Sequence, residues 1–143
     1  MTCPLKIYFP ARWEYLKIAE DIFSVIANNV TSDRQKAYNI MTVLSEAYNN
    51  AYLYGNKDSL DAQIVFETCF KNNKFTASII NEGTGFDDKN ISWNEYPSAD
   101  VESGRGLKII KQLCDKVEFR KISNNIFEVF VEIEIDENKI VRS

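Results

Sequence analysis

The pattern of apolar and polar positions divides the chain into strand-like and helix-like segments. In residues 5–9, apolar side chains occupy every second position, which is the pattern of a half-buried strand. In residues 12–29 and again in residues 34–54, apolar side chains recur every three or four positions, which predicts two amphipathic helices. A polar break at residues 31–33 separates them and supplies residue types that cap helix starts.

Two further pairs of alternating segments are each joined by a short polar turn, which predicts two β-hairpins. The paired segments are residues 63–70 with 75–79, and residues 117–122 with 126–136. Between the hairpins, residues 107–114 have helical spacing, and this helix is expected to begin at residues 104–106. The order of elements predicts an α+β fold, a two-layer α/β sandwich in which helices cover one face of a mixed, mostly antiparallel sheet.

One long segment, about residues 87–103, is polar and shows little regular pattern. A loop of this length inside a compact domain usually has a function, and a lid over a binding site is a common one. The chain shows no repeat and no linker, and its 143 residues are enough for one core. We therefore expect a single domain that spans residues 1–143.

Composition and charge narrow the classes of function. The hydrophobic share of 45% and the charged share of 27% are ordinary for a soluble globular protein. No apolar run approaches the roughly 20 residues of a membrane span, and the first residues lack the features of a signal peptide. The expectation is a cytoplasmic protein without a membrane partner. The net charge of −4 argues against direct binding to nucleic acid, which depends on basic patches.

The absence of histidine limits the available chemistry. It excludes Ser-His triads, Cys-His pairs and a phospho-accepting histidine, so acid–base chemistry must come from carboxylates, Lys, Tyr or Cys. The three cysteines, Cys3, Cys69 and Cys114, are far apart, and their spacing predicts neither a disulfide framework nor a metal site. Because Cys69 and Cys114 lie in apolar stretches, we expect them to be small core residues.

The five glycines are distributed unevenly, since four of them form two Gly-x-Gly clusters at residues 83–85 and 104–106. Glycine is required where the backbone takes a positive φ or closely approaches another group. A plain turn would explain either cluster alone. Two clusters on either side of a long polar loop, the second at a helix start, favour a phosphate-binding site.

Glu46 and Asn50 lie four residues apart and therefore share one face of the predicted helix at residues 34–54. This face lies opposite the apolar stripe, so a solvated helix face is one interpretation. The other is a binding site, because a carboxylate can accept a proton from a hydroxyl and an amide oxygen suits Mg²⁺. The residues alone leave both interpretations open.

Three segments together resemble the sequence boxes of a known superfamily, the GHKL ATPases, which have the Bergerat or histidine-kinase-like fold. They are Leu44-Ser-Glu-Ala-Tyr-Asn-Asn-Ala-Tyr-Leu-Tyr-Gly55, similar to the N-box, and Asn81-Glu-Gly-Thr-Gly-Phe86 and Glu102-Ser-Gly-Arg-Gly-Leu-Lys-Ile-Ile110, similar to the two glycine boxes. The similarity follows nearly the whole chain in order and spacing. Within the superfamily, the short length and the Gly-Arg-Gly-Leu run are most similar to the anti-sigma-factor serine/threonine-protein kinases.

The resemblance implies ATP and Mg²⁺ as cofactors and gives each matching residue a role. It assigns Glu46 as the general base and Asn50 as the Mg²⁺ ligand, and it makes residues 87–103 the ATP lid. The further nucleotide-binding residues that it implies are Asn81, Gly83, Gly85, Gly104, Arg105, Gly106 and Leu107.

One position departs from the family pattern, because the adenine-reading Asp of the family is Asn81 in this chain. The carbonyl oxygen of Asn81 can still accept a hydrogen bond from the adenine amino group, but it lacks the charge. The expected cost is on the order of 1 kcal/mol, which corresponds to about five- to tenfold weaker nucleotide binding.

The function that the resemblance implies is an anti-sigma regulatory factor. Such a protein sequesters a sigma factor and phosphorylates an anti-anti-sigma (STAS-type) antagonist on Ser or Thr, and the resemblance is also compatible with a homodimer. The alternative is a nucleotide-sensing or non-catalytic binding module that regulates a signalling partner, which Asn81 favours. The ATPase part of a sensor histidine kinase is a third class, disfavoured as a complete function because the chain has no histidine.

Overall fold

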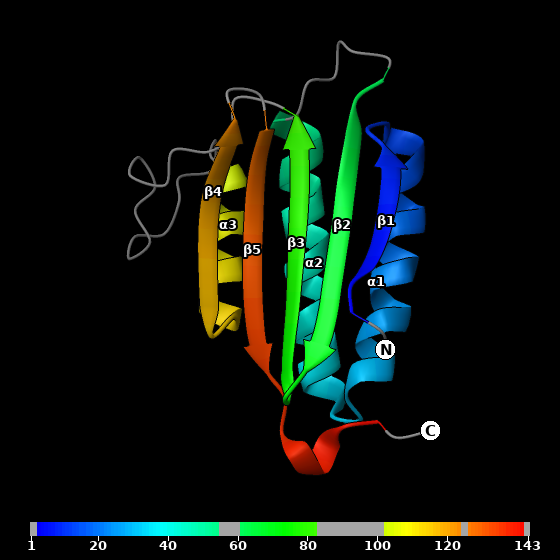
Figure 1. Cartoon of the computed structure of the whole chain (residues 1–143), viewed down its shortest axis with the longest axis vertical. Helices are drawn as coiled ribbons and strands as arrows, with labels where there is room; N and C mark the ends of the chain where they lie inside the picture. The colour runs from blue at the N-terminus through cyan, green and yellow to red at the C-terminus, as the bar shows by residue number, and fades with distance from the viewer. Residues whose placement is uncertain (1–2, 55–60, 83–101, 124–125, 142–143) are drawn as a thin grey trace.

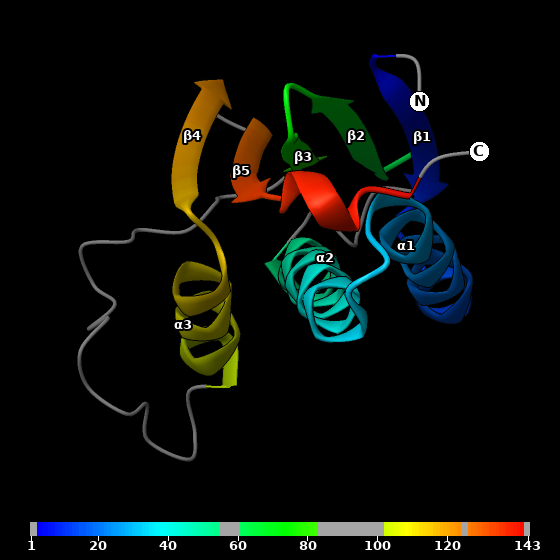
Figure 2. The ribbon, with the colours of Figure 1, turned by 90° about the horizontal axis from the view of Figure 1, so that it is seen from below.

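The computed structural model describes residues 3–54, 61–82, 102–123 and 126–141 and places them in two layers (Figure 1). The strands are β1 Leu5–Pro10, β2 Gln63–Lys71, β3 Lys74–Glu82, β4 Lys116–Ser123 and β5 Ile126–Glu134, and the α-helices are α1 Leu16–Val30, α2 Arg34–Tyr54 and α3 Glu102–Leu113. Seen from below, the three helices lie on the same face of the sheet (Figure 2). The predicted two-layer α+β fold is confirmed.

The strand order in the sheet is β1-β2-β3-β5-β4, and every neighbouring pair is antiparallel. The chain leaves β3 at one end of the sheet and returns through α3 to form the outer strand β4 before β5 pairs with β3. As a result, α2 and β3 both end, and α3 begins, at the same end of the molecule (Figure 1). This end brings together the segments that the sequence singles out.

The local sequence accounts for the start of α2 and for the turn between β2 and β3. The carboxylate of Asp33 accepts hydrogen bonds from the backbone N–H groups of Gln35 and Lys36 at 3.0 and 3.1 Å, so it caps α2, which begins at Arg34 as predicted. At the β2–β3 turn, Asn72 and Asn73 have φ of 55° and 62°, a left-handed conformation that asparagine tolerates. The sequence therefore makes this turn without glycine.

Two helix starts differ from the prediction. The backbone N–H of Tyr15 donates to the carbonyl of Arg12 at 3.1 Å, so a short 3₁₀ helix, Trp13–Tyr15, precedes α1, which begins only at Leu16. Helix α3 begins at Glu102, two residues before the first glycine of its cluster. The periodicity of apolar residues does not place the start of α1, because the 3₁₀ turn continues the apolar spacing of the helix.

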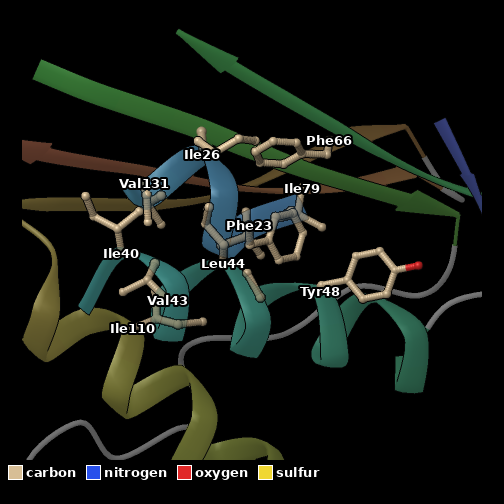
Figure 3. Close-up of a cluster of buried hydrophobic side chains, with 14 of the residues drawn as sticks. Phe23, Ile26, Ile40, Val43, Leu44, Tyr48, Phe66, Ile79, Ile110 and Val131 are labelled. Carbon is tan, nitrogen blue, oxygen red and sulfur yellow. The ribbon is translucent and has the colours of Figure 1, made fainter. Parts of the chain in front are cut away.

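The core fills the space between the sheet and the helices (Figure 3). Aromatic rings form its centre: Phe23 of α1 lies 5.0 Å from Phe66 of β2 and 5.9 Å from Tyr48 of α2 between ring centroids, and Phe9 of β1 lies 5.3 Å from Tyr48. Edge-on and tilted ring pairs of this kind stabilise a fixed arrangement. This cluster therefore holds α2 in place against the sheet.

The expectation that the cysteines form no disulfide is wrong. Cys3 and Cys69 are disulfide-bonded, with their Cα atoms 4.8 Å apart. The antiparallel pairing of β1 with β2, in which Leu5 lies opposite Thr68, makes residues 66 positions apart neighbours, and sequence spacing does not show such a pairing. Cys114 is a half-buried free cysteine beside the core, and burial raises the pKa of its thiol to about 12.

Candidate active site on α2 and α3

Helix α2 presents Glu46 and Asn50 on the side that faces α3. The position of α3 is fixed by Leu107 and Ile110, whose side chains are fully buried in the core. Between them and the helix start, Gly106 lies directly against the polar pair. A Cβ added at Gly106 would lie 2.7 Å from Oε2 of Glu46 and 3.3 Å from Nδ2 of Asn50. The structure thus brings Glu46 and Asn50 together with Gly106 of the second glycine cluster, more than fifty residues later in the sequence.

The close approach explains why residue 106 is a glycine. A separation of 2.7 Å is shorter than any ordinary carbon–oxygen contact, so a side chain at Gly106 would displace the carboxylate of Glu46. Without a Cβ at residue 106, the backbone of α3 approaches the polar pair while the carboxylate of Glu46 keeps its position. The glycine therefore serves the geometry of the site and not a turn, because it lies inside the helix.

Asn50 is buried, with 2% of its surface exposed. Among the described residues, its Nδ2 atom has no hydrogen-bond partner. A buried donor without a partner costs about 1–3 kcal/mol, and such groups in folded proteins commonly have a functional reason. The interpretation of this position as part of a solvated helix face is therefore wrong, and a polar ligand that supplies the missing partner fits the site.

Glu46 is half-buried, and burial raises the pKa of its carboxyl group above the usual value. A carboxylate that is partly removed from water holds a proton more strongly, so it is a better general base than an exposed one. Perturbed carboxyl groups that face a buried polar neighbour are typical of functional sites.

Asn81 lies at the end of β3, at the end of the molecule where α2 also ends (Figure 1). It is 3% exposed, and its Cα partners are Ile64 on β2 and Phe127 on β5. Its Nδ2 atom donates to the backbone oxygen of Glu82 at 3.4 Å. With the amide nitrogen held in this way, the carbonyl oxygen of Asn81 is the acceptor that this side chain can offer to a ligand.

The other predicted site residues are described only in part. Gly83, Gly85 and nearly all of the predicted lid at residues 87–103 lie outside the described residues. Gly104 and Arg105 belong to the first turns of α3. The side chain of Leu107 is 1% exposed and packs in the core, so a contact between this residue and a nucleotide stays a prediction.

Within the described residues, no group of three or more His, Cys, Asp or Glu side chains could hold a metal ion by itself. The donor set at Glu46 and Asn50 is one carboxylate and one amide. Mg²⁺ commonly accepts so few protein oxygens when waters and phosphate oxygens complete its coordination. The residues therefore fit Mg²⁺ that arrives together with a polyphosphate.

One further buried polar atom was not predicted from the sequence. Tyr48, which is on α2 like Glu46 and Asn50, has a buried hydroxyl group. Among the described residues, this hydroxyl has no hydrogen-bond partner. Tyr48 occupies a position with the apolar spacing of residues 34–54, where only its phenolic oxygen distinguishes it from phenylalanine. A hollow of about 510 Å³ lies elsewhere, between the end of α3 and β4, and none of the predicted site residues lines it.

Comparison with known proteins identifies the type of domain. A family model described as a histidine kinase-like ATPase domain matches residues 9–129, which is most of the chain. Among curated proteins, no sequence matches. Among the described residues, no helix is both long and apolar enough to cross a membrane.

Several solved structures have a similar fold. The RsbU and RsbW domains of Rv1364c from Mycobacterium tuberculosis match with a TM-score of 0.67 and 16% identity, over 93% of this chain and 32% of that one. The histidine kinase domain of a blue-light activated kinase from Erythrobacter litoralis EL346 matches with a TM-score of 0.56 and 17% identity, over 88% of this chain and 61% of that one. The catalytic domain of histidine kinase ThkA matches with a TM-score of 0.57 and 15% identity, over 91% of this chain and 97% of that one.

The chain spans about a third of the first of these proteins and about three fifths of the second. At identities of 15–17%, the likeness shows the fold alone.

Proposed function

The chain belongs to the histidine kinase-like ATPase domain family, and from this premise we propose that it transfers the γ-phosphate of ATP to a serine or threonine of a partner protein. The observation that carries the proposal is the contact of Gly106 with Glu46 and Asn50. It places a half-buried carboxylate, a buried amide and the backbone of a helix near its N-terminus around one point. A phosphoryl-transfer site needs a base, an oxygen ligand and phosphate-binding donors in such an arrangement.

Each residue has a specific task in this proposal. Glu46 accepts the proton of the attacking hydroxyl while that oxygen bonds to the γ-phosphorus, and the bond from the γ-phosphorus to the bridging oxygen of ADP breaks. The raised pKa of Glu46 favours uptake of this proton. Oxygen Oδ1 of Asn50 would hold Mg²⁺, which when bound neutralises charge on the phosphates. Backbone N–H groups in the first turn of α3, including that of Gly104, would bind the phosphates together with Arg105, and Gly106 would allow the close approach of α3. Asn81 would accept from the adenine amino group.

The proposed partners are a sigma factor and an anti-anti-sigma protein of the STAS type. Two observations support this choice: the sequence boxes resemble those of the anti-sigma serine/threonine kinases, and one structure of the same fold is named for its RsbU and RsbW domains. Phosphorylation adds about −1.5 to −2 charges and can break an interface, so it would release the antagonist. A cytoplasmic location and a homodimer belong to the same proposal, and light scattering tests the homodimer.

A phosphate-transfer assay tests the activity. Purified protein, [γ-³²P]ATP and Mg²⁺ are incubated with candidate STAS-domain proteins, and the label on the antagonist is measured for the wild type and for Glu46→Ala. We expect labelling by the wild type and a loss of at least a hundredfold in the variant, since general-base catalysis contributes about 10²–10⁴-fold. No transfer to any antagonist by a wild type that binds ATP would refute the kinase activity.

Asn81 favours a second candidate, a nucleotide-sensing module without chemistry. The neutral amide at the base-reading position removes charge assistance, which a module that only senses nucleotide tolerates better than an enzyme. Capture of a partner distinguishes the two candidates. A partner that binds wild type and Glu46→Ala equally, and that is never phosphorylated, would support the sensing module.

A further inference from the structure

The hydroxyl group of Tyr48 is a buried polar group that the proposed phosphoryl transfer does not use. Tyr48 is 1% exposed, and its oxygen has no hydrogen-bond partner among the described residues. A phenylalanine would make the same ring contacts with Phe9 and Phe23 without burying an unpaired hydroxyl. The hydroxyl therefore requires a partner that is not part of the described protein.

The direction of the hydroxyl indicates where this partner lies. In Figure 3, the ring of Tyr48 lies at the margin of the apolar cluster, and its oxygen points away from the other labelled side chains. It points toward the end of the molecule where α2 and β3 end (Figures 1 and 3). This is the end that holds Asn50 and Asn81.

The strand register relates Tyr48 to Asn81. The ring of Tyr48 packs edge-on against Phe9, at 5.3 Å between centroids. Phe9 lies opposite Ile64 on β2, and Ile64 lies opposite Asn81 on β3. Tyr48 therefore packs under the β1 end of the row of paired residues Phe9, Ile64 and Asn81, and in this row Ile64 separates Phe9 from the buried amide of Asn81.

The phenolic oxygen of Tyr48 combines both kinds of hydrogen-bonding group in one atom. A neutral phenol can donate one hydrogen bond and accept others, which suits the mixed donors and acceptors of a purine base.

We propose that the hydroxyl of Tyr48 is a nucleotide-binding group at the inner, base-side wall of the pocket, where it hydrogen-bonds the base directly or through one retained water. The inference rests on the proposed binding of ATP and adds a residue to the nucleotide site. It assigns part of the selectivity for the base to a residue in the interior of the fold, in addition to Asn81 at the strand end.

Calorimetric titration with ATP tests the inference on three proteins: wild type, Tyr48→Phe and Tyr38→Phe. Tyr38 is an exposed tyrosine on the same helix and serves as the matched control. We expect Tyr48→Phe to bind ATP about five- to tenfold more weakly, as for the loss of one net hydrogen bond, and Tyr38→Phe to bind like the wild type. Tripolyphosphate, measured as a competitor, should bind wild type and Tyr48→Phe equally because it has no base.

Urea unfolding without ligand separates a binding role from a structural one. Tyr48→Phe should be at least as stable as the wild type, because it removes an unpaired buried hydroxyl. Unchanged ATP affinity in Tyr48→Phe would overturn the inference and leave the proposed function intact. Weaker ATP binding that accompanies lower stability, or an equal loss for tripolyphosphate, would overturn it as well. A wild type that binds no ATP would refute the proposed function together with the inference.

Discussion

The two sides of helix α2 make different kinds of contact, although the residues involved are close together in the sequence. On one side, Tyr48 packs into an aromatic cluster with Phe9 and Phe23, and this contact fixes the helix. On the other side, Glu46 and Asn50 meet the backbone of α3 at Gly106, and a buried amide nitrogen is left without a partner among the described residues. The comparison shows that the aromatic side supplies ring packing and leaves only the hydroxyl of Tyr48 unpaired, while on the opposite side the polar pair itself is kept available for a ligand at a cost in stability.

The largest expected effect is a loss of folding stability from a substitution on the aromatic side. Phe23→Ala removes a fully buried ring that contacts Phe66 and Tyr48, so the free energy of unfolding should fall by about 3–5 kcal/mol. Urea denaturation measures the change. The control is Val25→Ala, at a 62% exposed position of α1, the helix that also carries Phe23. This variant should change stability by less than about 0.5 kcal/mol. A loss below about 1 kcal/mol for Phe23→Ala would show that the cluster does not hold α2.

The next effect is on the polar side and concerns activity. In Gly106→Ala, the new Cβ displaces the carboxylate of Glu46, and misplacement of a reacting group by about 1 Å can cost a hundredfold in rate. We expect phosphate transfer to fall roughly ten- to a hundredfold. The free energy of unfolding should change by less than about 1 kcal/mol, because alanine is the better helix former.

The control for this variant is Gln112→Ala, at an exposed position of α3. Full activity in Gly106→Ala would mean that Glu46 can move aside without consequence. Its contact with α3 would then be irrelevant to the reaction.

At Asn50, a substitution is expected to raise the stability of the unliganded protein slightly and to abolish its stabilisation by ATP. Asn50→Leu replaces a buried amide, whose nitrogen has no partner among the described residues, by an apolar group of similar size. The unliganded protein should be as stable as the wild type or more stable by about 1 kcal/mol, while ATP with Mg²⁺ should no longer raise its melting temperature. Thermal unfolding with and without the ligand measures both. A strongly destabilised variant would indicate a structural hydrogen bond at this position.

The smallest effect is the pH dependence contributed by Glu46. Because burial raises the pKa of Glu46 in the folded protein, the folded state favours the protonated form. Wild type and Glu46→Gln should be equally stable below the usual pKa of a glutamate. As the pH rises through the raised pKa, the wild type should lose stability relative to the variant.

Urea midpoints of the two proteins at pH 4 and pH 7 measure this difference. Glu14→Gln, at an exposed position, is the control. If the urea midpoints of wild type and Glu46→Gln differ at pH 4 but agree at pH 7, the raised pKa of Glu46 is contradicted.

The fold was largely predictable because its signals are local. The alternating strands, the apolar stripe of α2, the cap at Asp33 and the turn at Asn72 and Asn73 each act within a few residues. Their order along the chain is enough to suggest helices on one face of a sheet. The start of α1 was less predictable, because the 3₁₀ turn before Leu16 has the same apolar spacing as a helix.

The site was predictable in its residues but not in its environment. Glu46 and Asn50 could be selected from the spacing and the resemblance, yet their side of α2 is polar and could equally have faced solvent. Helix α3, held by Leu107 and Ile110, returns over this side and brings Gly106 against Asn50, which is buried. The unpaired hydroxyl of Tyr48 and the Cys3–Cys69 bond also depend on contacts between distant segments, which a linear pattern does not encode.

The Cys3–Cys69 bond closes a covalent ring that contains β1, α1, α2 and nearly all of β2, and excludes the strands and the helix that follow. A protease that cuts the chain once inside this ring leaves two fragments that still migrate together in a denaturing gel. They separate only after a reductant is added. A cut after the ring gives two bands under either condition, so gel mobility with and without reductant reports on which half of the molecule was cleaved.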